Sequence, residues 1–226
     1  MDWIQQYSFI LLDFDGLLVN TEALHFRAYQ KMCADRGFAL TWDFSKYASI
    51  AHSSAEGLRL SIYADFPALN NQEPDWTVLY AEKKKAYQDL LLLGEIQLMP
   101  GVDLFLSFLA EKNIKRCVVT NSFKEQTDLI SQHIPLLRTI PFWVTRRDYN
   151  LPKPAPDPYL TALQKYGTIE DKVIGFEDTA RGLESLLAAS VEAVLVSATA
   201  ASFFERKNVR YASSFQEFFS GKEKRC

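Results

Sequence analysis

Short apolar runs recur along this chain, and segments with helical spacing of their apolar residues separate them. The runs are rich in Val, Ile, Leu and Phe, a pattern typical of parallel strands that are covered on both faces. Four runs predict strands at residues 8–12, 115–120, 173–176 and 193–196, with a weaker fifth candidate at 142–145. This alternation of strand and helix predicts an α/β fold with a doubly wound, Rossmann-like parallel sheet.

Capping residues predict where several helices begin and end. Ser122 and Glu125 have the spacing of a capping box, which predicts a helix from residue 122. Asp157 before Pro158 predicts an N-cap followed by proline at the first helical position, and Gly167 ends that helix. Further helices are expected over residues 102–112 and 179–189.

The interval between the first two predicted strands is much longer than a crossover requires. The first strand ends near residue 13 and the second begins near residue 115, whereas a βα crossover needs only ~10–12 residues. The interval has a helical pattern: Leu24, Ala28 and Met32 recur at a spacing of four, in a helix expected from Asn20 or Thr21 to Arg36. A longer helix is expected over residues 75–93. We therefore expect an all-helical domain at residues 20–93, inserted into an α/β core formed by residues 1–19 and 94–226.

Composition excludes several classes of function. The chain has 226 residues, a net charge of −3 and 48% apolar residues, so it lacks the basic excess that favours nucleic-acid binding. The three cysteines, Cys33, Cys117 and Cys226, are too widely spaced for a disulfide framework or a zinc site. We expect neither a signal peptide nor a membrane span, because the first residues lack a basic start and an apolar core, and no apolar run approaches the ~18 residues that a span needs. We expect a cytoplasmic monomer that binds neither nucleic acid nor membrane.

Polar residues follow the predicted strands at the points where the strands end. Because ligands bind beyond the carboxyl ends of parallel strands, we expect these side chains to meet at one edge of the sheet. They are four carboxylates, a lysine and the residues at one helix start: Asp13, Asp15, Glu177, Asp178, Lys153, Thr120, Asn121 and Ser122.

This combination of residues favours phosphoryl transfer. Carboxylates that lie close together resist ionisation, and Mg²⁺, which prefers oxygen ligands, would offset their charge. The Thr120 hydroxyl, the amides at the helix start and the Lys153 ammonium suit a phosphate group. Asp13 and Asp15 are two residues apart, so both can point to the same side. One could attack phosphorus and form an aspartyl phosphate, while the other handles the proton of the leaving group.

The same residues resemble four signatures of the haloacid dehalogenase (HAD) superfamily. The signatures are Asp13-Phe14-Asp15-Gly16 with Asn20-Thr21-Glu22, Val118-Val119-Thr120-Asn121-Ser122, Lys153-Pro154-Ala155-Pro156-Asp157, and Gly175-Phe176-Glu177-Asp178-Thr179 with Gly182. They occur in the order typical of the family and together span most of the chain. The resemblance implies that the helical insertion is a cap that closes over the site and selects the substrate.

The resemblance also implies the catalytic roles. Asp13 would be the nucleophile, and Asp15 would protonate the leaving oxygen and then activate water. Thr120, with the amides of the next two residues, would bind the phosphoryl oxygens. Lys153 would orient Asp13 and offset its charge.

The implied cofactor is Mg²⁺. Asp13, Asp178 and the backbone carbonyl of Asp15 would hold the ion, and Glu177 is a further candidate ligand. The implied substrate-binding residues are Asn121 and Ser122 in the core, with His25 and Lys83 in the cap.

Two departures from the family pattern leave questions open. Arg146 and Arg147 stand where relatives often have small or acidic residues, and they are either surface charges or contacts to an anionic substrate. Ser190 replaces the glycine that is usual before the fifth strand. The run from Lys83 to Lys85 could also be a solvated helix face, and His25 could be an ordinary histidine at the edge of a core.

Asp15 narrows the function, because relatives that dehalogenate or cleave phosphonates lack an aspartate there. The positions of His25 and Lys83 resemble β-phosphoglucomutase, but the phosphate-gripping arginine of the mutase cap falls on Ser54. We therefore expect a phosphatase acting on a small phosphorylated metabolite such as a sugar phosphate. The alternatives are a sugar-phosphate mutase and a non-catalytic binding protein on the same scaffold.

Overall fold

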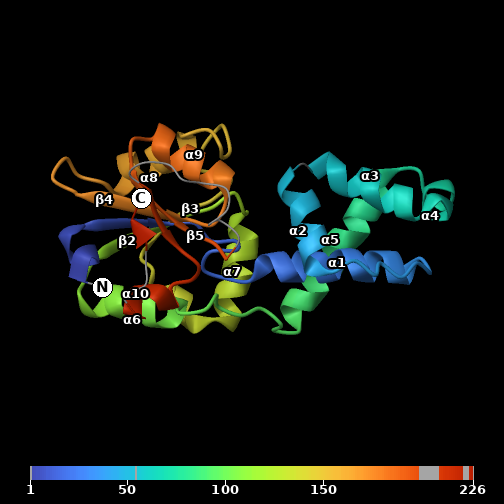
Figure 1. Cartoon of the computed structure of the whole chain (residues 1–226), viewed down its shortest axis with the longest axis horizontal. Helices are drawn as coiled ribbons and strands as arrows, with labels where there is room; N and C mark the ends of the chain where they lie inside the picture. The colour runs from blue at the N-terminus through green and yellow to red at the C-terminus, as the bar shows by residue number, and fades with distance from the viewer. Residues whose placement is uncertain (1, 54, 199–208, 221–223, 226) are drawn as a thin grey trace. The chain divides into compact units, whose positions relative to one another are not determined.

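The computed structural model describes residues 2–53, 55–198, 209–220 and 224–225. The chain forms two compact units (Figure 1). The core unit is Met1–Asn20 with Gln97–Cys226, and the helical unit is Thr21–Ile96. Ser54 and Cys226 lie outside the described residues. No helix in the described ranges is long and apolar enough to cross a membrane.

In its described part, the core unit contains a seven-stranded sheet with the strand order β3-β2-β1-β4-β5-β6-β7. The strands are β1 Phe9–Leu12, β2 Lys115–Val119, β3 Phe142–Val144, β4 Val173–Glu177, β5 Glu192–Val196, β6 Val209–Ala212 and β7 Lys224–Arg225. The first six are parallel, and β7 pairs antiparallel with β6. The five predicted strands and the doubly wound α/β class are confirmed, whereas β6 and β7 were not predicted.

Helices cover both faces of this sheet (Figure 1). They are α6 Val102–Glu111, α7 Lys124–His133, α8 Asp157–Tyr166, α9 Ala180–Ala188 and α10 Gln216–Ser220, with short 3-10 helices at Asp2–Gln6 and Pro135–Thr139. Phe9 and Leu11 of β1 pack in one buried cluster with residues of α8 and α9. On the other face, Phe176 of β4 lies 5.2 Å from Phe105 of α6, measured between ring centroids. All four residues of β1 are buried, as a strand covered on both faces requires.

The helical unit contains α1 Thr21–Asp35, α2 Phe44–Ser53, α3 Ala55–Asp65, α4 Pro67–Gln72 and α5 Trp76–Leu92. The apolar stripe predicted for α1 is confirmed, because Leu24, Ala28 and Met32 are all buried. Asp75 caps α5 and accepts a hydrogen bond of 2.9 Å from the Thr77 amide. The core of this unit mixes aromatic and aliphatic side chains, with Tyr29, Tyr47 and Tyr63 among its buried residues, so aromatic packing contributes to its burial.

The predicted capping box at Ser122 is wrong. Helix α7 begins at Lys124, and the amide of Phe123 donates to Oε1 of Gln126 at 3.3 Å. The Ser122 hydroxyl donates instead to Asp15. Ser122 therefore bonds to Asp15, beyond the end of the first strand, and does not cap the helix that its spacing suggested.

Two other predicted local features also differ in detail. Helix α8 begins at Asp157, so the N-cap position is Pro156, and the Asp157 carboxylate accepts from the Leu151 amide at 3.1 Å. Ser190 has a φ of +59°, in the left-handed region that favours glycine.

Candidate active site

Asp13 and Glu177 lie at the carboxyl edge of the sheet, where β1 and β4 run side by side. The amide of Asp13 donates to the carbonyl of Phe176 at 3.0 Å, so the two strand ends are in register. Lys153 comes from the loop that precedes α8. Its ammonium donates to Asp13 Oδ1 at 2.5 Å, to Glu177 Oε1 at 2.6 Å and to the Val119 carbonyl at 2.8 Å. These three acceptors account for all three protons of the ammonium group.

Two buried acids share one buried cation in this cluster. The side chains of Asp13, Lys153 and Glu177 are 9%, 6% and 1% exposed, respectively. Burial, and then the charge of Glu177, raise the pKa of Asp13 well above its ordinary value, although Lys153 opposes the rise. Burial would lower the pKa of Lys153, but the two carboxylates outweigh it and raise that pKa. Lys153 is therefore a permanent cation that only partly neutralises two buried acids.

Two donors hold the carboxylate of Glu177 through one of its oxygens. The Tyr159 hydroxyl of α8 donates to Oε1, the oxygen that Lys153 also contacts. Burial, and then Glu177, raise the pKa of Tyr159 well above its ordinary value, so Tyr159 stays a donor. A Cβ atom on Gly182, in the first turn of α9, would lie only 1.9 Å from Glu177 Oε2. Glu177 therefore fills space that only a glycine at 182 leaves open.

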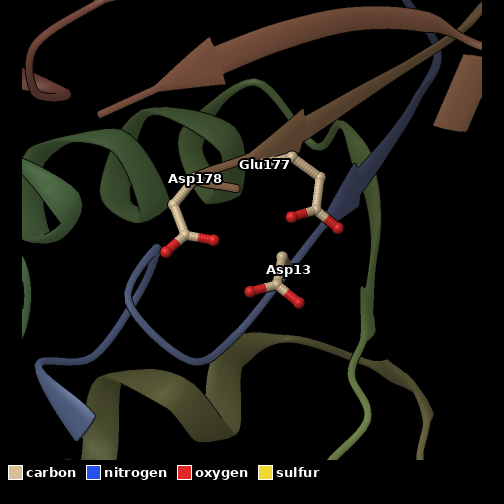
Figure 2. A group of neighbouring side chains, drawn as sticks. All are labelled: Asp13, Glu177 and Asp178. Atoms are coloured by element: carbon tan, nitrogen blue, oxygen red, sulfur yellow. The ribbon is translucent and has the colours of Figure 1, made fainter. Parts of the chain in front are cut away.

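Three carboxylates could share a cation. Asp13, Glu177 and Asp178 each offer an oxygen within 4.8 Å of the others, and Figure 2 shows their carboxylates directed into a common space. Oxygen donors of this kind are the ligands that Mg²⁺ prefers. The uncompensated charge of the cluster also favours a cation. The donor set therefore fits a hard divalent ion in both its chemistry and its charge.

Asp15 lies beyond the first strand, in a tight turn. Gly16 has a φ of +81°, and its amide donates to the Val19 carbonyl at 2.9 Å, closing the turn. Asp15 Oδ2 accepts from the Thr120 hydroxyl at 2.9 Å and from the Ser122 hydroxyl at 2.7 Å. These two bonds fix the orientation of the carboxylate. The loop after β2 and the turn after β1 are therefore in direct contact.

The loop after β2 is ordered by its own hydrogen bonds. The amide of Ser122 donates to the Thr120 hydroxyl at 2.9 Å, and Thr120 is fully buried. The side-chain oxygen of Asn121 faces the Tyr149 hydroxyl at 2.7 Å and the Lys153 amide at 3.4 Å. The structure therefore brings together all eight core residues predicted for the site.

His25 and Lys83 belong to the helical unit, where they contact each other. Lys83 Nζ lies 2.8 Å from His25 Nδ1, and the His25 ring stacks on Tyr87 with centroids 4.1 Å apart. Burial, and then Lys83, lower the pKa of His25 to about 3. His25 is therefore neutral and accepts from the Lys83 ammonium.

Lys83 is buried, so the interpretation of residues 83–85 as a solvated face is wrong for this residue. Its side chain is among the buried ones of α5, and its ammonium lies 4.9 Å from the ring centroid of Tyr29. Burial, and then Lys84, lower its pKa to about 8. Lys84 and Lys85 are exposed, as expected for the other face of the helix.

The two arginines after β3 differ. Arg147 is exposed and pairs with Glu125, so it is a surface charge. Arg146 is half-buried; its guanidinium lies 5.4 Å from the ring centroid of Tyr149 and donates to the Tyr149 carbonyl at 3.2 Å.

Sequence reasoning missed Tyr149 and Tyr159. Both contact site residues, yet neither lies in a signature or at a strand end. A tyrosine in a loop or on a helix face is ordinarily part of a core. The sequence therefore held no local signal that could have identified them.

Comparison with known proteins identifies the family of the chain. The family model described as haloacid dehalogenase-like hydrolase matches residues 10–196. The phosphorylated carbohydrates phosphatase of Thermotoga maritima is 26% identical over 185 residues, which cover 82% of this chain and 82% of that protein. The fructose-1-phosphate phosphatase YqaB of Escherichia coli is 25% identical over 190 residues, which cover 84% of this chain and 96% of that protein.

A solved structure shows the same fold. CbbY from Rhodobacter sphaeroides, crystallised in complex with phosphate, superimposes with a TM-score of 0.70 at 21% identity, covering 94% of this chain and 96% of that one. The family match extends from β1 to β5 and contains Asp13, Asp15, Lys153 and Asp178. The resemblance found in the sequence is confirmed: the chain belongs to the haloacid dehalogenase-like hydrolase family.

Proposed function

We propose that this chain is a phosphatase that hydrolyses the phosphate monoester of a small carbohydrate or a related metabolite. The observation that carries the proposal is the pairing of Asp13 with Lys153, next to an Asp15 carboxylate that Thr120 and Ser122 hold in place. This arrangement supplies a nucleophile and a separate acid/base. The names of the two relatives, which refer to phosphorylated carbohydrates and to fructose 1-phosphate, support the substrate class.

In the proposed reaction, a carboxylate oxygen of Asp13 attacks phosphorus in line with the leaving oxygen. The bond between phosphorus and the leaving oxygen breaks, and Asp15 gives that oxygen a proton. Asp15 then takes a proton from water, whose oxygen attacks the phosphorus of the aspartyl phosphate. Inorganic phosphate leaves and the Asp13 carboxylate is regenerated.

The surrounding groups bind and orient the phosphoryl group. The Thr120 hydroxyl and the amides of Asn121 and Ser122 would contact its oxygens. To do so, the Thr120 hydroxyl would exchange its bond to Asp15, and the Ser122 amide its bond to the Thr120 hydroxyl, for bonds to the phosphoryl group. Lys153 would hold the attacking carboxylate of Asp13 and offset part of the charge that develops. Because Glu177 and Val119 occupy the other two protons of Lys153, its ammonium has one fixed position.

The residues that would hold Mg²⁺ are Asp13, Asp178 and the backbone carbonyl of Asp15. The bound ion would supply charge neutralisation at a phosphoryl oxygen and would lower the repulsion between the acids and the substrate. Glu177 lies within reach of the same space. Its contacts with Lys153 and Tyr159 favour a different role, in which Glu177 is the counter-ion that fixes Lys153.

The helical unit would act as the cap that selects the substrate. Lys83 and His25 are its proposed substrate-binding residues. The buried Lys83 ammonium contacts His25 and the ring of Tyr29, both neutral groups, so it is suited to an anionic or hydroxyl-rich ligand. Neutral His25 fixes the direction of that ammonium.

The test is a panel of phosphorylated metabolites, assayed for phosphate release by the wild type and by Asp13→Asn. Asp128→Asn, which alters an exposed carboxylate paired with Lys124, is the control. Release should require Asp13 and survive in the control. Release that persists in Asp13→Asn would refute the covalent mechanism. Conversion of β-glucose 1-phosphate to glucose 6-phosphate, primed by the bisphosphate, would establish the mutase alternative instead.

A further inference from the structure

Tyr149 connects the two loops that carry the proposed catalytic groups. It lies in the loop between β3 and α8 and is 8% exposed. Its hydroxyl contacts the Thr120 carbonyl at 2.9 Å and Asn121 Oδ1 at 2.7 Å. Both partners are in the loop after β2 that would bind the phosphoryl group.

The bond to Thr120 determines how the next amide points. The carbonyl of Thr120 and the N–H of Asn121 belong to one planar trans peptide, in which they point in opposite directions. Holding the carbonyl on the Tyr149 side therefore turns the Asn121 N–H away from Tyr149. That amide is one of the proposed donors to the phosphoryl group.

The bond to Asn121 ties the same hydroxyl to Lys153. The backbone amide of Lys153 can only donate, so the atom of Asn121 that faces it at 3.4 Å is the side-chain oxygen. The orientation of the Asn121 side chain therefore depends jointly on Tyr149 and on the segment that carries Lys153.

Tyr149 is itself fixed from its other side. The Arg146 guanidinium packs over its ring and donates to its carbonyl. The Arg146 amide donates to the Ser122 carbonyl at 2.9 Å, which brings the 146–149 segment onto the loop after β2 a second time. Burial is the largest influence on Tyr149 and raises its pKa to about 12, so the hydroxyl keeps its proton.

We infer that Tyr149 is a positioning residue of the phosphate-binding loop, acting through Asn121 and the Thr120–Asn121 peptide. Its hydroxyl holds the amide donors of that loop, and the Lys153 segment, in the arrangement that receives the phosphoryl group. This inference rests on the proposed function and deepens it.

The test compares Tyr149→Phe with Tyr166→Phe. Both variants keep the ring and remove one hydroxyl that contacts a backbone carbonyl, but Tyr166 contacts Trp143, outside the site, at 3.5 Å. Four quantities are measured with Mg²⁺ present: kcat and KM on the best substrate, the affinity for inorganic phosphate by calorimetry, and Tm. We expect Tyr149→Phe to lower phosphate affinity and kcat/KM about tenfold each, since the Thr120 carbonyl and Asn121 Oδ1 lose the one hydroxyl proton that they share. Tyr166→Phe should stay within about twofold of the wild type.

A double-mutant cycle with Asn121→Ala locates the effect. If Tyr149 acts through Asn121, Tyr149→Phe should lower phosphate affinity less in the Asn121→Ala background than in the wild type. Equal losses in both backgrounds would support action through the Thr120–Asn121 peptide alone, because Asn121→Ala keeps the bond to the Thr120 carbonyl. Wild-type phosphate affinity in Tyr149→Phe would overturn the inference, even if Tm falls. A fall in Tm without a loss of phosphate affinity would show that Tyr149 has only a structural role.

The calorimetry separates this inference from the proposed function. A wild type that binds phosphate but hydrolyses no ester would refute the phosphatase proposal, while a loss of affinity in Tyr149→Phe would still support the positioning role. A wild type that hydrolyses esters, with Tyr149→Phe unchanged in phosphate affinity and kcat/KM, would refute only the positioning role. A wild type that binds no phosphate would refute the positioning role as well, because the loop would then have no anion to receive.

Discussion

Gly182 and the carboxylate of Glu177 occupy adjoining space: a methyl group built on Gly182 would lie 1.9 Å from Oε2 and 2.2 Å from Oε1 of Glu177. Gly182 lies in the first turn of α9, where the Thr179 hydroxyl accepts from its amide at 3.2 Å. The first turn of α9 is thus held close to the Glu177 carboxylate. The glycine of the fourth signature lets α9 approach β4 closely enough to confine Glu177.

We expect Gly182→Ala to disable the enzyme through Glu177. The new methyl group must displace either the carboxylate or the helix, and the carboxylate would then lose its contacts with Lys153 and Tyr159. Overpacking at this point should lower the free energy of unfolding by about 2 kcal/mol. Loss of the fixed Lys153 should lower kcat by about a hundredfold.

Chemical denaturation and steady-state kinetics measure the two effects of Gly182→Ala. Tyr159→Phe is the companion variant, because it removes one of the contacts to Glu177 without adding volume. It should lower kcat less than Gly182→Ala does. A Gly182→Ala enzyme with wild-type kcat would show that Glu177 can move without consequence for Lys153.

The sequence predicted the parts of the fold that follow from local pattern. Strands β1 to β5 are short apolar runs, and the ends of β1, β2 and β4 placed Asp13, Thr120 and Glu177 at one edge of the sheet. Strand β6 was missed because Arg210 interrupts its apolar residues. A two-residue strand such as β7 has too little pattern to detect.

Contacts between distant segments could not be predicted in the same way. The Ser122 hydroxyl could have capped the nearby helix. It donates a hydrogen bond instead to Asp15, which is far away in the sequence. The burial of Lys83 was unexpected because a run of three lysines is typical of a solvated helix face. Its two lysine neighbours are exposed, whereas Lys83 is buried because α5 packs against α1. Tyr149 and Tyr159 acquire their roles only through tertiary contacts.

Ser122→Ala should reduce turnover by releasing Asp15 on one side. The variant removes the donor that lies 2.7 Å from Asp15 Oδ2 and leaves the Thr120 donor in place. Losing one hydrogen bond to a charged group should lower kcat about tenfold, with a smaller change in KM. Ser131→Ala is the control, because it removes a hydroxyl of α7 that donates to the Thr127 carbonyl at 2.8 Å. An equal loss of kcat in both variants would mean that the effect is not specific to Asp15.

Removal of divalent cations should abolish phosphate release. We expect EDTA to lower activity at least a hundredfold and added Mg²⁺ to restore it, because the acidic cluster would otherwise repel a phosphate dianion. Asp178→Asn should raise the Mg²⁺ concentration that gives half-maximal activity about tenfold. Calorimetric titration with Mg²⁺ provides a reading independent of turnover, and Asp128→Asn is again the control. Full activity in EDTA would contradict the proposed metal site.

Lys83 should destabilise the folded chain at neutral pH, because burial lowers the pKa of its amine from 10.5 to about 8. Below pH 8 both the folded and the unfolded chain carry the proton, and a shift of this size costs the folded state about 3 kcal/mol. Between pH 8 and 10.5 only the unfolded chain keeps the proton fully, so stability rises with pH and the cost disappears.

We therefore expect Lys83→Met to raise the free energy of unfolding at pH 7 by about 1–2 kcal/mol, less than the full amount because His25 loses its partner. As the pH approaches 10.5 the cost of the buried charge disappears and only the lost His25 contact remains, so the difference from the wild type should fall by about 3 kcal/mol and change sign, whereas exposed Lys84→Met should show no such trend. Urea unfolding at pH 7, 8.5 and 10 measures the free energy of unfolding of both variants. Steady-state kinetics show whether the stabilised Lys83→Met enzyme binds its substrate more weakly. A Lys83→Met protein that is less stable than the wild type at pH 7 would mean that the contacts with His25 and Tyr29 outweigh the burial of the charge.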